Sequence, residues 1–544
     1  MYDFIIIGAG SAGCVLANRL SADPATTVLL LEAGPSDRHP FIHMPAGLSK
    51  LAGNTRINWD YSTAPEPQLD HRTLWWPRGK VLGGSSSINA MCYVRGVPGD
   101  YDAWAEGGAT DWDWNSVLPS FRRAEGNARG GDALHGGDGP LSVSDLRHVN
   151  PLSLAFIEAG CQAGHQANDD FNGATQEGFG LYQVTQRDGA RCSSAVAYLD
   201  PAKRRPNLTV HSGAMASRIT FDGRRATGVV YTMLGKAFHQ PAAREVLLCG
   251  GAINSPQLLM LSGIGPAAAL RRCGIDVVAD LAGVGGNLQD HLDICMLRHC
   301  TQPITYDRVG DLRVAFDYYL RGRRGPGTSN IAEAGAFVRS RFAPDARPDI
   351  QLHFIPAMVD DHGRHRLPGD GYTLHACFLR PHSRGRISLV SNRAADKPRI
   401  EANYLGDAEG FDLRMALECA KLSREILAQP AFDAYRGAPI FPARDDLDDA
   451  ALVAYIRAKA ETVYHPVGTC RMGVGEDAVV DPQLRVRGVD GLRVVDASVM
   501  PSLTRGNTNA PTIAIAERAA DLIVGRAPLA PLDPVETPAP ALIA

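Results

Sequence analysis

The 544-residue sequence lacks the features that mark several common classes of protein. No apolar run approaches the roughly 18 residues that a membrane-spanning helix needs. Basic and acidic residues number 55 and 59, so no overall field attracts nucleic acid, and nucleic acid is not expected as a partner. The N-terminus has no basic region before its apolar run, which argues against a secretory signal peptide.

Paired cysteines are also absent. The eleven cysteines are odd in number and scattered without a CxxC pair, which disfavours a disulfide framework and predicts reduced thiols in a cytoplasmic protein. No metal is expected, because the near pair His362 and His365 has no further Cys or His at useful ligand spacing. We interpret that pair as part of a polar loop at the entrance of a site. With 45 % hydrophobic residues, the chain can bury a large interior in two or more domains.

The opening residues have the pattern of a dinucleotide-binding unit. An apolar strand at residues 3–7 ends in GAGSAG, and a segment with helical spacing follows. Gly8 permits the tight turn, Gly10 lets the backbone approach a pyrophosphate, and Gly13 allows close packing of helix on strand. A second apolar run ends in Glu32, which is placed to bind ribose hydroxyls and disfavours NADP. The pattern alone leaves both FAD and NAD open.

Four more glycine-rich segments lie far apart in the sequence. Residues 75–96 carry a Gly-Gly-Ser-Ser-Ser run whose N–H and hydroxyl groups can bind phosphate or a polar ring edge. Residues 245–266 are typical of a strand, turn and helix, and residues 283–293 form a turn that can brace a cofactor or cap a loop. Residues 491–525 predict a strand, the loop GNTNAPT and a helix, and that loop lies where open α/β sheets bind ligands.

Taken in order, these segments resemble the glucose–methanol–choline (GMC) family of FAD-dependent oxidoreductases over nearly the whole chain. The resemblance implies an α/β fold class (α+β overall), with a Rossmann-like FAD-binding domain assembled from discontinuous segments. A substrate-binding domain, built on an antiparallel sheet covered by helices, is inserted between them. The expected FAD-binding domain comprises residues 1–155, 190–300 and 460–526, and the expected substrate-binding domain comprises residues 156–189 and 301–459. Residues 527–544 are rich in proline and alanine and are expected to form a flexible tail.

The resemblance also implies which residues bind FAD. In the family, a segment like 77–96 runs along the flavin, and one like 494–512 delivers backbone groups to the pyrophosphate and the ring. Some members attach FAD covalently through a histidine in the GGSSSIN region; Ile88 stands there in this chain, so non-covalent FAD is predicted. The implied cofactor-binding residues are Gly8, Gly10, Ser11, Ala12, Gly13, Glu32, Ala33, Trp59, Arg78, Gly79, Val81, Gly83, Gly84, Ser85, Asn89, Ala90, Met91, Cys92, Ala216, Gly250, Asp496, Ala497, Asn507 and Thr508.

The histidine of the HPVGTCRMG segment is the expected catalytic base. The resemblance places His465 before the flavin, facing Asn509 of the GNTNAPT segment. An alcohol gives a hydride to flavin N5 most easily while its hydroxyl proton is leaving, so a base within hydrogen-bond reach is needed. An amide can hold the substrate oxygen and aim the carbon. The expected substrate-binding residues are Val94, Asn330, Glu333, Phe354 and Tyr464.

The implied reaction is oxidation of primary alcohols, aliphatic or aromatic, to aldehydes. Choline is the main rival substrate, because its quaternary ammonium needs aromatic rings and a carboxylate, and Glu333 is available. A glutamate satisfied by a backbone or arginine partner is the alternative for Glu333. The expected acceptor is a quinone or an artificial acceptor, with oxygen as the alternative. A hydroxynitrile lyase of the same fold, which uses the histidine without redox chemistry, is a further alternative.

One stretch, LRVAFDYYLRGRRG at 312–325, mixes aromatic and aliphatic residues with arginines. We interpret it as a partly buried helix with a solvated basic end. Docking on a membrane surface is the alternative, and it would suit an encounter with membrane quinone. The expected location is therefore the cytoplasm, with association with the inner face of the membrane as a second option.

Overall fold

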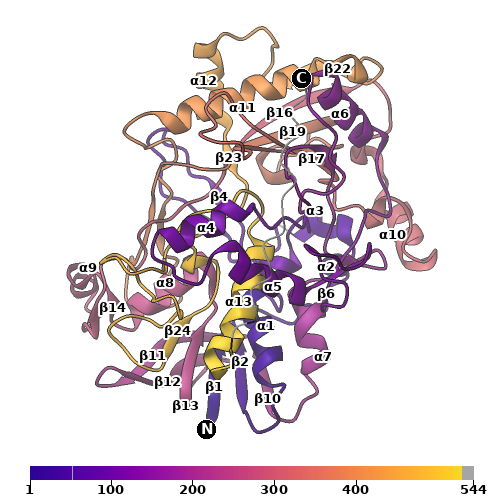
Figure 1. Cartoon of the computed structure of the whole chain (residues 1–544). Coiled ribbons are helices and arrows are strands. Elements are labelled where there is room, and N and C mark those ends of the chain that lie inside the picture. The colour runs from indigo at the N-terminus through magenta and orange to yellow at the C-terminus, as the bar shows by residue number, and fades with distance from the viewer. Residues whose placement is uncertain (52, 528, 530–544) are drawn as a thin grey trace.

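The computed structural model describes residues 1–51, 53–527 and 529, and its framework is two large sheets with helices around them (Figure 1). The first sheet has a parallel part with β1 inside it. Its strands are β10 (Leu208–Ser212), β2 (Val28–Glu32), β1 (Tyr2–Ile7), β13 (Lys236–Leu248) and β24 (Leu492–Val494). The other half of β13 continues antiparallel into β12 (Arg225–Met233) and β11 (Ala214–Asp222).

Buried apolar residues explain the centre of this sheet. Ile5 of β1 pairs with Leu29 of β2 on one side and with Val246 of β13 on the other, and all three are fully buried. Continuous apolar strands of this kind are typical of parallel sheets covered on both faces. The helix predicted after the glycine turn is α1 (Ser11–Leu20), and it packs against α13 (Asn509–Val524) from the far end of the chain.

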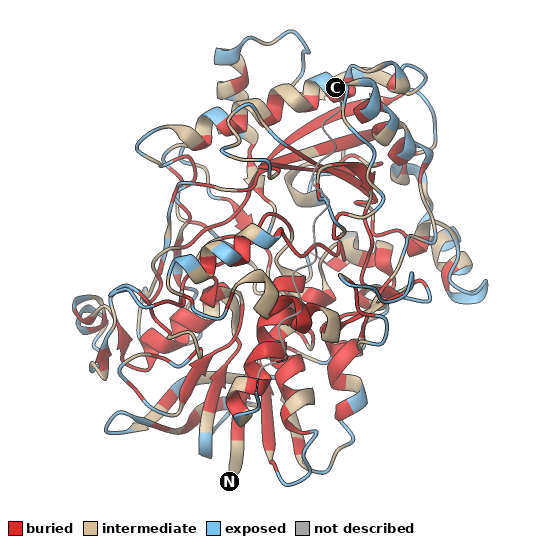
Figure 2. Ribbon diagram, viewed as in Figure 1, coloured by how far each residue is buried: buried red, intermediate tan, exposed pale blue. Residues whose placement is uncertain are grey.

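The second sheet is antiparallel. Its strands are β7 (Gly178–Leu181), β17 (Ala334–Val338), β18 (Ile350–Ile355), β19 (Gly371–Phe378), β16 (Leu292–Cys300) and β22 (Arg436–Phe441), with β23 (Glu461–Thr462) paired to β16. The helices that pack on it are α6 (Pro151–Gln162), α11 (Phe411–Leu427) and α12 (Asp449–Lys459). Figure 2 shows that the central strands of both sheets are buried. The predicted fold class is confirmed.

Two strands pair with the sheet of the other domain than the one to which the predicted borders assign them. β16 and β23 fall within the ranges 190–300 and 460–526 that were assigned to the FAD-binding domain, yet both pair within the second sheet. Pairing partners far away in sequence decide to which sheet such a strand belongs, so local patterns do not reveal it. The division into two domains stays a prediction, with these borders moved.

Two other expectations concern membranes and the tail. Among the helices that the structure describes, none combines the length and the apolar character needed to cross a bilayer. The predicted flexible tail at 527–544 lies outside the described residues, apart from positions 527 and 529.

Candidate active site

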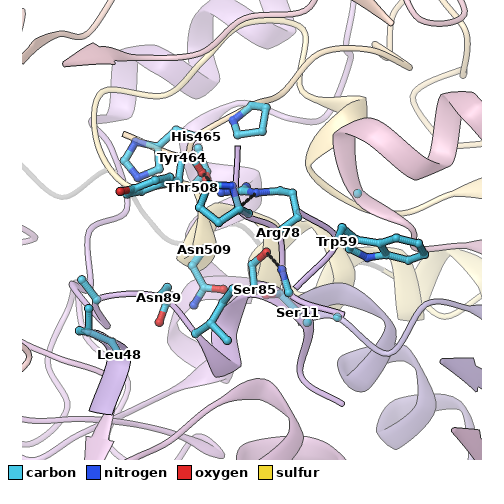
Figure 3. Close-up of a pocket in the computed structure, with 18 of the residues that line it drawn as sticks. Ser11, Leu48, Trp59, Arg78, Ser85, Asn89, Tyr464, His465, Thr508 and Asn509 are labelled. Atoms are coloured by element: carbon cyan, nitrogen blue, oxygen red, sulfur yellow. Dashed lines mark hydrogen bonds between the residues drawn. The ribbon is translucent and has the colours of Figure 1, made fainter. Parts of the chain in front are cut away.

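A cavity of about 760 Å³ extends from the glycine turn after β1 to His465 (Figure 3). One end is lined by residues at the carboxyl ends of β1 and β2, and the other by residues of β18 and β19, among them His353 and His375. Open α/β sheets bind ligands beyond the carboxyl ends of their strands, so the first end is suited to a dinucleotide. The second end is formed by the antiparallel sheet, to which the sequence-based expectation assigns substrate binding, and we call it the substrate end.

Glycine backbones approach one another closely at the dinucleotide end. A Cβ atom on Gly84, whose φ is +55°, would lie 2.7 Å from Cα of Gly10. A Cβ on Gly13 would lie 1.9 Å from the carbonyl oxygen of Gly8. Side chains at these positions would push apart the strand, the helix and the loop that form the turn. The N-terminus of α1 consequently faces the cavity with free space before it, as a pyrophosphate requires.

Glu32 lies at the end of β2, where the sequence predicts an acidic residue. Its Oε2 accepts a hydrogen bond from the Ala9 N–H at 2.9 Å, and its Oε1 accepts one from the Gly34 N–H at 2.8 Å. Burial raises the pKa of Glu32 to about 7. The carboxylate therefore ties the two turns together at the wall of the cavity.

Asp496 joins two glycine-rich segments that lie far apart in sequence. Its Oδ2 accepts hydrogen bonds from the N–H of Gly251 at 2.8 Å and from the hydroxyl of Ser255 at 2.5 Å, both at the start of α8 (Gly251–Leu261). Its Oδ1 accepts one from the N–H of Ser498 at 2.8 Å. The carboxylate thus satisfies helix N–H groups that have no partner within the helix.

Most of the predicted cofactor-binding residues line the cavity. They are Gly8, Gly10, Ser11, Ala12, Glu32, Ala33, Trp59, Arg78, Gly79, Gly84, Ser85, Asn89, Ala90, Met91, Cys92, Ala216, Gly250, Asp496, Ala497, Asn507 and Thr508. Gly13, Val81 and Gly83 do not line it. Val81 is buried in a separate apolar cluster with Ile42, and the Gly83 N–H donates to the Ala9 carbonyl oxygen at 2.7 Å. Gly13 and Gly83 therefore contact the backbone of the glycine turn outside the cavity, and Val81 packs away from the cavity.

His465 reaches the other end of the cavity and is almost buried, with 7 % of its surface exposed. Its backbone N–H donates to Oδ1 of Asp290 at 2.7 Å. Its ring makes two contacts: Nδ1 lies 3.0 Å from Nδ1 of His291, and Nε2 lies 3.1 Å from Nδ2 of Asn507. Both ring nitrogens are therefore held in place.

The neighbours of His465 determine which ring nitrogen carries the hydrogen. Nε2 of His291 faces the carbonyl oxygen of Leu379 at 3.3 Å, and because that oxygen only accepts, Nε2 is the protonated atom. Burial lowers the pKa of His291 to about 3, so the ring is neutral and its Nδ1 accepts a hydrogen bond. His465 must then donate from Nδ1, which leaves the lone pair on its Nε2. Burial first, and the neighbouring His291 second, hold the pKa of His465 well below its ordinary value.

Asn509 does not face His465, which corrects the sequence-based expectation. Its Oδ1 accepts a hydrogen bond from the Ser11 hydroxyl at 2.7 Å, so its side chain lies at the dinucleotide end (Figure 3). Asn507, predicted only to bind the cofactor, stands beside His465, and its Oδ1 accepts from Nε2 of Gln351 at 3.0 Å. α13 begins at Asn509, and its first turn packs beside α1, whereas Asn507 belongs to the loop before the helix.

Glu333 is the second correction. Its carboxylate accepts hydrogen bonds from the hydroxyls of Ser329 at 2.6 Å and Ser153 at 2.7 Å, from the Asn150 N–H at 2.8 Å, and from the hydroxyl of Tyr306. The residue is fully buried and does not line the cavity. Four donors satisfy this carboxylate, so it has no oxygen left to offer to a cationic substrate.

Of the other predicted substrate-binding residues, Asn330 and Tyr464 line the cavity, and Val94 and Phe354 do not. Val94 is buried in an apolar cluster behind Cys92, and Phe354 stacks against the ring of Phe156 within the core. An alternating strand presents every second residue to the opposite face. The sequence alone does not indicate which face of β18 lines the cavity. His353 and Ile355 lie on the face that does, and Phe354 lies on the opposite face.

Sequence reasoning missed several polar residues at the substrate end. Asp293, His375 and Glu461 line the cavity, and Oδ2 of Asp293 lies 2.5 Å from Nδ1 of His375. The other oxygen of Asp293 is buried without a hydrogen-bond partner in the part of the chain that the structure describes. Burial, reinforced by the Asp293 charge, raises the pKa of Glu461 to about 7. In the sequence, the only pattern that indicates this group is the alternation of Asp293 and Cys295, which places both on one face of β16.

Two groups of these polar side chains have the spacing of metal ligands. One is formed by Asp293, Cys295 and His375 and the other by Asp361, His362 and Glu461. Asp293 is already hydrogen-bonded to His375 and to the Cys295 thiol, and Nδ1 of His362 lies 3.5 Å from a Glu461 oxygen. The expectation that no metal is bound stays a prediction.

Comparison with known proteins identifies relatives over nearly the whole chain. The family model described as GMC oxidoreductase matches residues 2–293 and, in its C-terminal part, residues 381–516. The chain is 50 % identical to an alcohol dehydrogenase [acceptor] of Pseudomonas putida, covering 98 % of this chain and 97 % of that protein. It is 48 % identical to the mitochondrial choline dehydrogenase of Homo sapiens, covering 96 % and 90 %. A solved formate oxidase of Aspergillus oryzae, described in terms of the effect of a mutation on FAD modification, superposes with a TM-score of 0.90 at 28 % identity, covering 96 % of this chain and 98 % of that one.

Proposed function

Because the chain belongs to the GMC oxidoreductase family, as its motifs predict, we propose that it oxidises primary alcohols, aliphatic or aromatic, to aldehydes. The family and its solved members establish FAD as the cofactor, and the close approach of Gly10 and Gly84 suits its pyrophosphate. When bound, FAD would supply the hydride acceptor for this oxidation. The observation that carries the proposal is His465, a neutral base whose Nε2 lone pair lies beside Asn507 at the cavity.

The residues around His465 have separate tasks in this reaction. Nε2 takes the hydroxyl proton of the alcohol, while the Nδ1 hydrogen stays bonded to His291. The amide of Asn507, oriented by Gln351, can donate to the substrate oxygen as negative charge develops on it. The half-buried Arg78, whose guanidinium donates to the Tyr464 carbonyl oxygen at 2.8 Å, adds positive charge nearby. His465 is almost buried, so bulk water is largely kept from the base.

Choline is the second candidate substrate, and it rests on a different observation. Glu333 is occupied by its own partners, but Asp293 and Glu461 both line the cavity, and one Asp293 oxygen has no partner among the described residues. A quaternary ammonium can be stabilised by such a carboxylate together with aromatic rings such as that of Tyr464. The human relative named choline dehydrogenase favours the same candidate.

For the acceptor, we infer a quinone, which the two electrons and two protons lost by the alcohol convert to a hydroquinone. The relative of Pseudomonas putida is named for an unspecified acceptor rather than for oxygen, which supports this choice. Oxygen remains the alternative, since the superposed formate oxidase is named as an oxidase.

The decisive experiment is an anaerobic absorbance spectrum of the purified protein before and after addition of 1-hexanol, benzyl alcohol or choline. We expect the flavin band to bleach with 1-hexanol or benzyl alcohol and to return slowly in air, as for a dehydrogenase. Rapid return in air would identify an oxidase, and bleaching by choline alone would establish the second candidate. No bleaching with any of the three would overturn the proposal and favour a lyase without redox chemistry.

A separate prediction concerns how the cofactor is held. Ile88 lines the cavity at the position where a histidine would attach the flavin, so the flavin is expected to be released when the protein is precipitated with acid. The measurement is flavin absorbance in the supernatant after precipitation. Yellow colour that stays with the pellet would show a covalent bond and contradict the prediction.

A further inference from the structure

Helix α10 (Asp311–Leu320) presents apolar side chains to solvent. Leu312 is 89 % exposed, Phe316 50 % and Leu320 73 %, and their spacing of four residues places them on one face of the helix. Tyr319, also 50 % exposed, borders this face. Figure 2 shows α10 as an exposed projection at the edge of the molecule. We call Leu312, Phe316, Tyr319 and Leu320 the apolar face of α10.

The opposite side of α10 is firmly attached to the protein. Tyr318 is only 2 % exposed, and its hydroxyl donates to the carbonyl oxygen of His43 at 2.9 Å. Gly327, in the short turn η5 (Gly325–Thr328), lies under the ring of Tyr318. The helix therefore has a buried side of its own. On the apolar face, the Tyr319 hydroxyl donates to the Pro40 carbonyl oxygen at 3.1 Å and Arg321 lies over the Phe316 ring, but Leu312, Phe316 and Leu320 stay half or more exposed. Contiguous exposed apolar surface on a globular protein commonly marks an interaction site.

Positive charge surrounds this face. Arg313, Arg321, Arg323 and Arg324 are all exposed, while the only acidic residues from 311 to 325 are Asp311 and Asp317. Asp317 pairs with Arg321 at 3.3 Å. This net positive charge is a property of the segment alone, since the formal net charge of the whole chain is −4. An amphipathic helix with apolar residues on one face and arginines beside it has the composition of helices that lie in a membrane interface.

The segment that leads into α10 lines the cavity. Tyr306 of η4 (Tyr306–Arg308) and Val309 line the cavity, and α10 begins two residues after Val309. Leu48 of α3 (Leu48–Leu51) also lines it, and the preceding segment supplies the His43 carbonyl that holds Tyr318. A surface bound to α10 would consequently lie close to this wall of the cavity.

We propose that α10 docks the protein on an anionic membrane surface. Leu312, Phe316 and Leu320 enter the boundary between headgroups and acyl chains, and the flanking arginines pair with lipid phosphates. The proposal rests on the proposed function, because docking would bring the cavity close to a quinone dissolved in that membrane. The sequence led us to interpret this segment as a partly buried helix with a solvated basic end. α10 is partly buried, but its exposed side carries apolar residues as well as arginines.

The test is co-sedimentation of the FAD-loaded protein with vesicles. We expect binding to vesicles of phosphatidylcholine with phosphatidylglycerol, weaker binding to phosphatidylcholine alone, and release by salt. The double variant F316S/L320S and the triple variant R321Q/R323Q/R324Q are each expected to bind about tenfold more weakly, since each removes one of the two attractive terms. Leu234→Ser is the matched control, because Leu234 is 92 % exposed in the turn between β12 and β13, far from α10 in Figure 1.

Three results would overturn the proposal: no binding of the wild type to either vesicle, equal binding by the α10 variants, or a wild-type dimer that F316S/L320S dissociates without vesicles. The third would show that a second copy of the chain covers the face. Flavin reduction by alcohol, measured without vesicles, should be unchanged in all variants. If alcohol does not reduce the flavin of the wild type, the proposed function is contradicted. This outcome is distinguishable from a failure to bind lipid, because it is measured without vesicles.

Discussion

Replacement of His465 with alanine is expected to slow flavin reduction by alcohol by about 10³-fold or more, because both the proton acceptor and the alignment of the substrate oxygen are lost. FAD should remain bound, since the ring lies at the substrate end and takes no part in the glycine turn. Anaerobic stopped-flow absorbance measures the rate, and the flavin-to-protein absorbance ratio measures cofactor content. A rate near that of the wild type would refute His465 as the base.

Two comparisons sharpen this test. His239→Ala is the control, because His239 is an exposed histidine on β13 and lies outside the cavity. The second comparison is the pH profile of the wild type. Because the pKa of His465 is lowered, its ring stays neutral as the pH falls below the usual value for histidine. The reduction rate should therefore stay constant from about pH 8 down to about pH 6 and decline only at lower pH. A tenfold loss per unit below pH 7 would contradict the lowered pKa.

His291→Leu is expected to produce the next largest effect, a reduction rate about 10- to 100-fold lower at little change in KM. His291 does not line the cavity, so it acts through His465 as a positioning residue. Without the acceptor at its Nδ1, the ring of His465 can place its hydrogen on Nε2, where it can no longer accept the substrate proton. Steady-state kinetics over a range of alcohol concentrations separates kcat from KM.

The conservative variant His291→Asn distinguishes positioning from simple damage to the fold. An asparagine oxygen can accept the hydrogen bond from Nδ1 of His465, so we expect this variant to recover much of the rate. Melting temperature and FAD content should be measured for both variants. If Asn and Leu are equally slow while both remain folded and loaded with FAD, the tautomer explanation is wrong.

The sequence could predict those features of the fold and the site that depend on residues close together in the chain. The strand, the GAGSAG turn, the helix and Glu32 all lie within the first 32 residues, and their contacts are local, so the spacing of glycines and apolar residues was sufficient. His465 was identified in a similar way, from the residues directly around it. Its environment could not be, because His291 is 174 positions earlier and Asn507 is 42 later.

Tertiary structure decided between options that the sequence leaves equal. Asn507 and Asn509 are two residues apart in one loop, and only the start of α13 turns the first toward His465 and the second toward Ser11. Glu333 is a carboxylate in a suitable segment, but four donors occupy it, and three of them, from Asn150, Ser153 and Tyr306, come from other segments of the chain. Motifs record the chemistry of neighbouring residues, whereas the direction and the partners of a side chain depend on segments brought together only when the sheets pack.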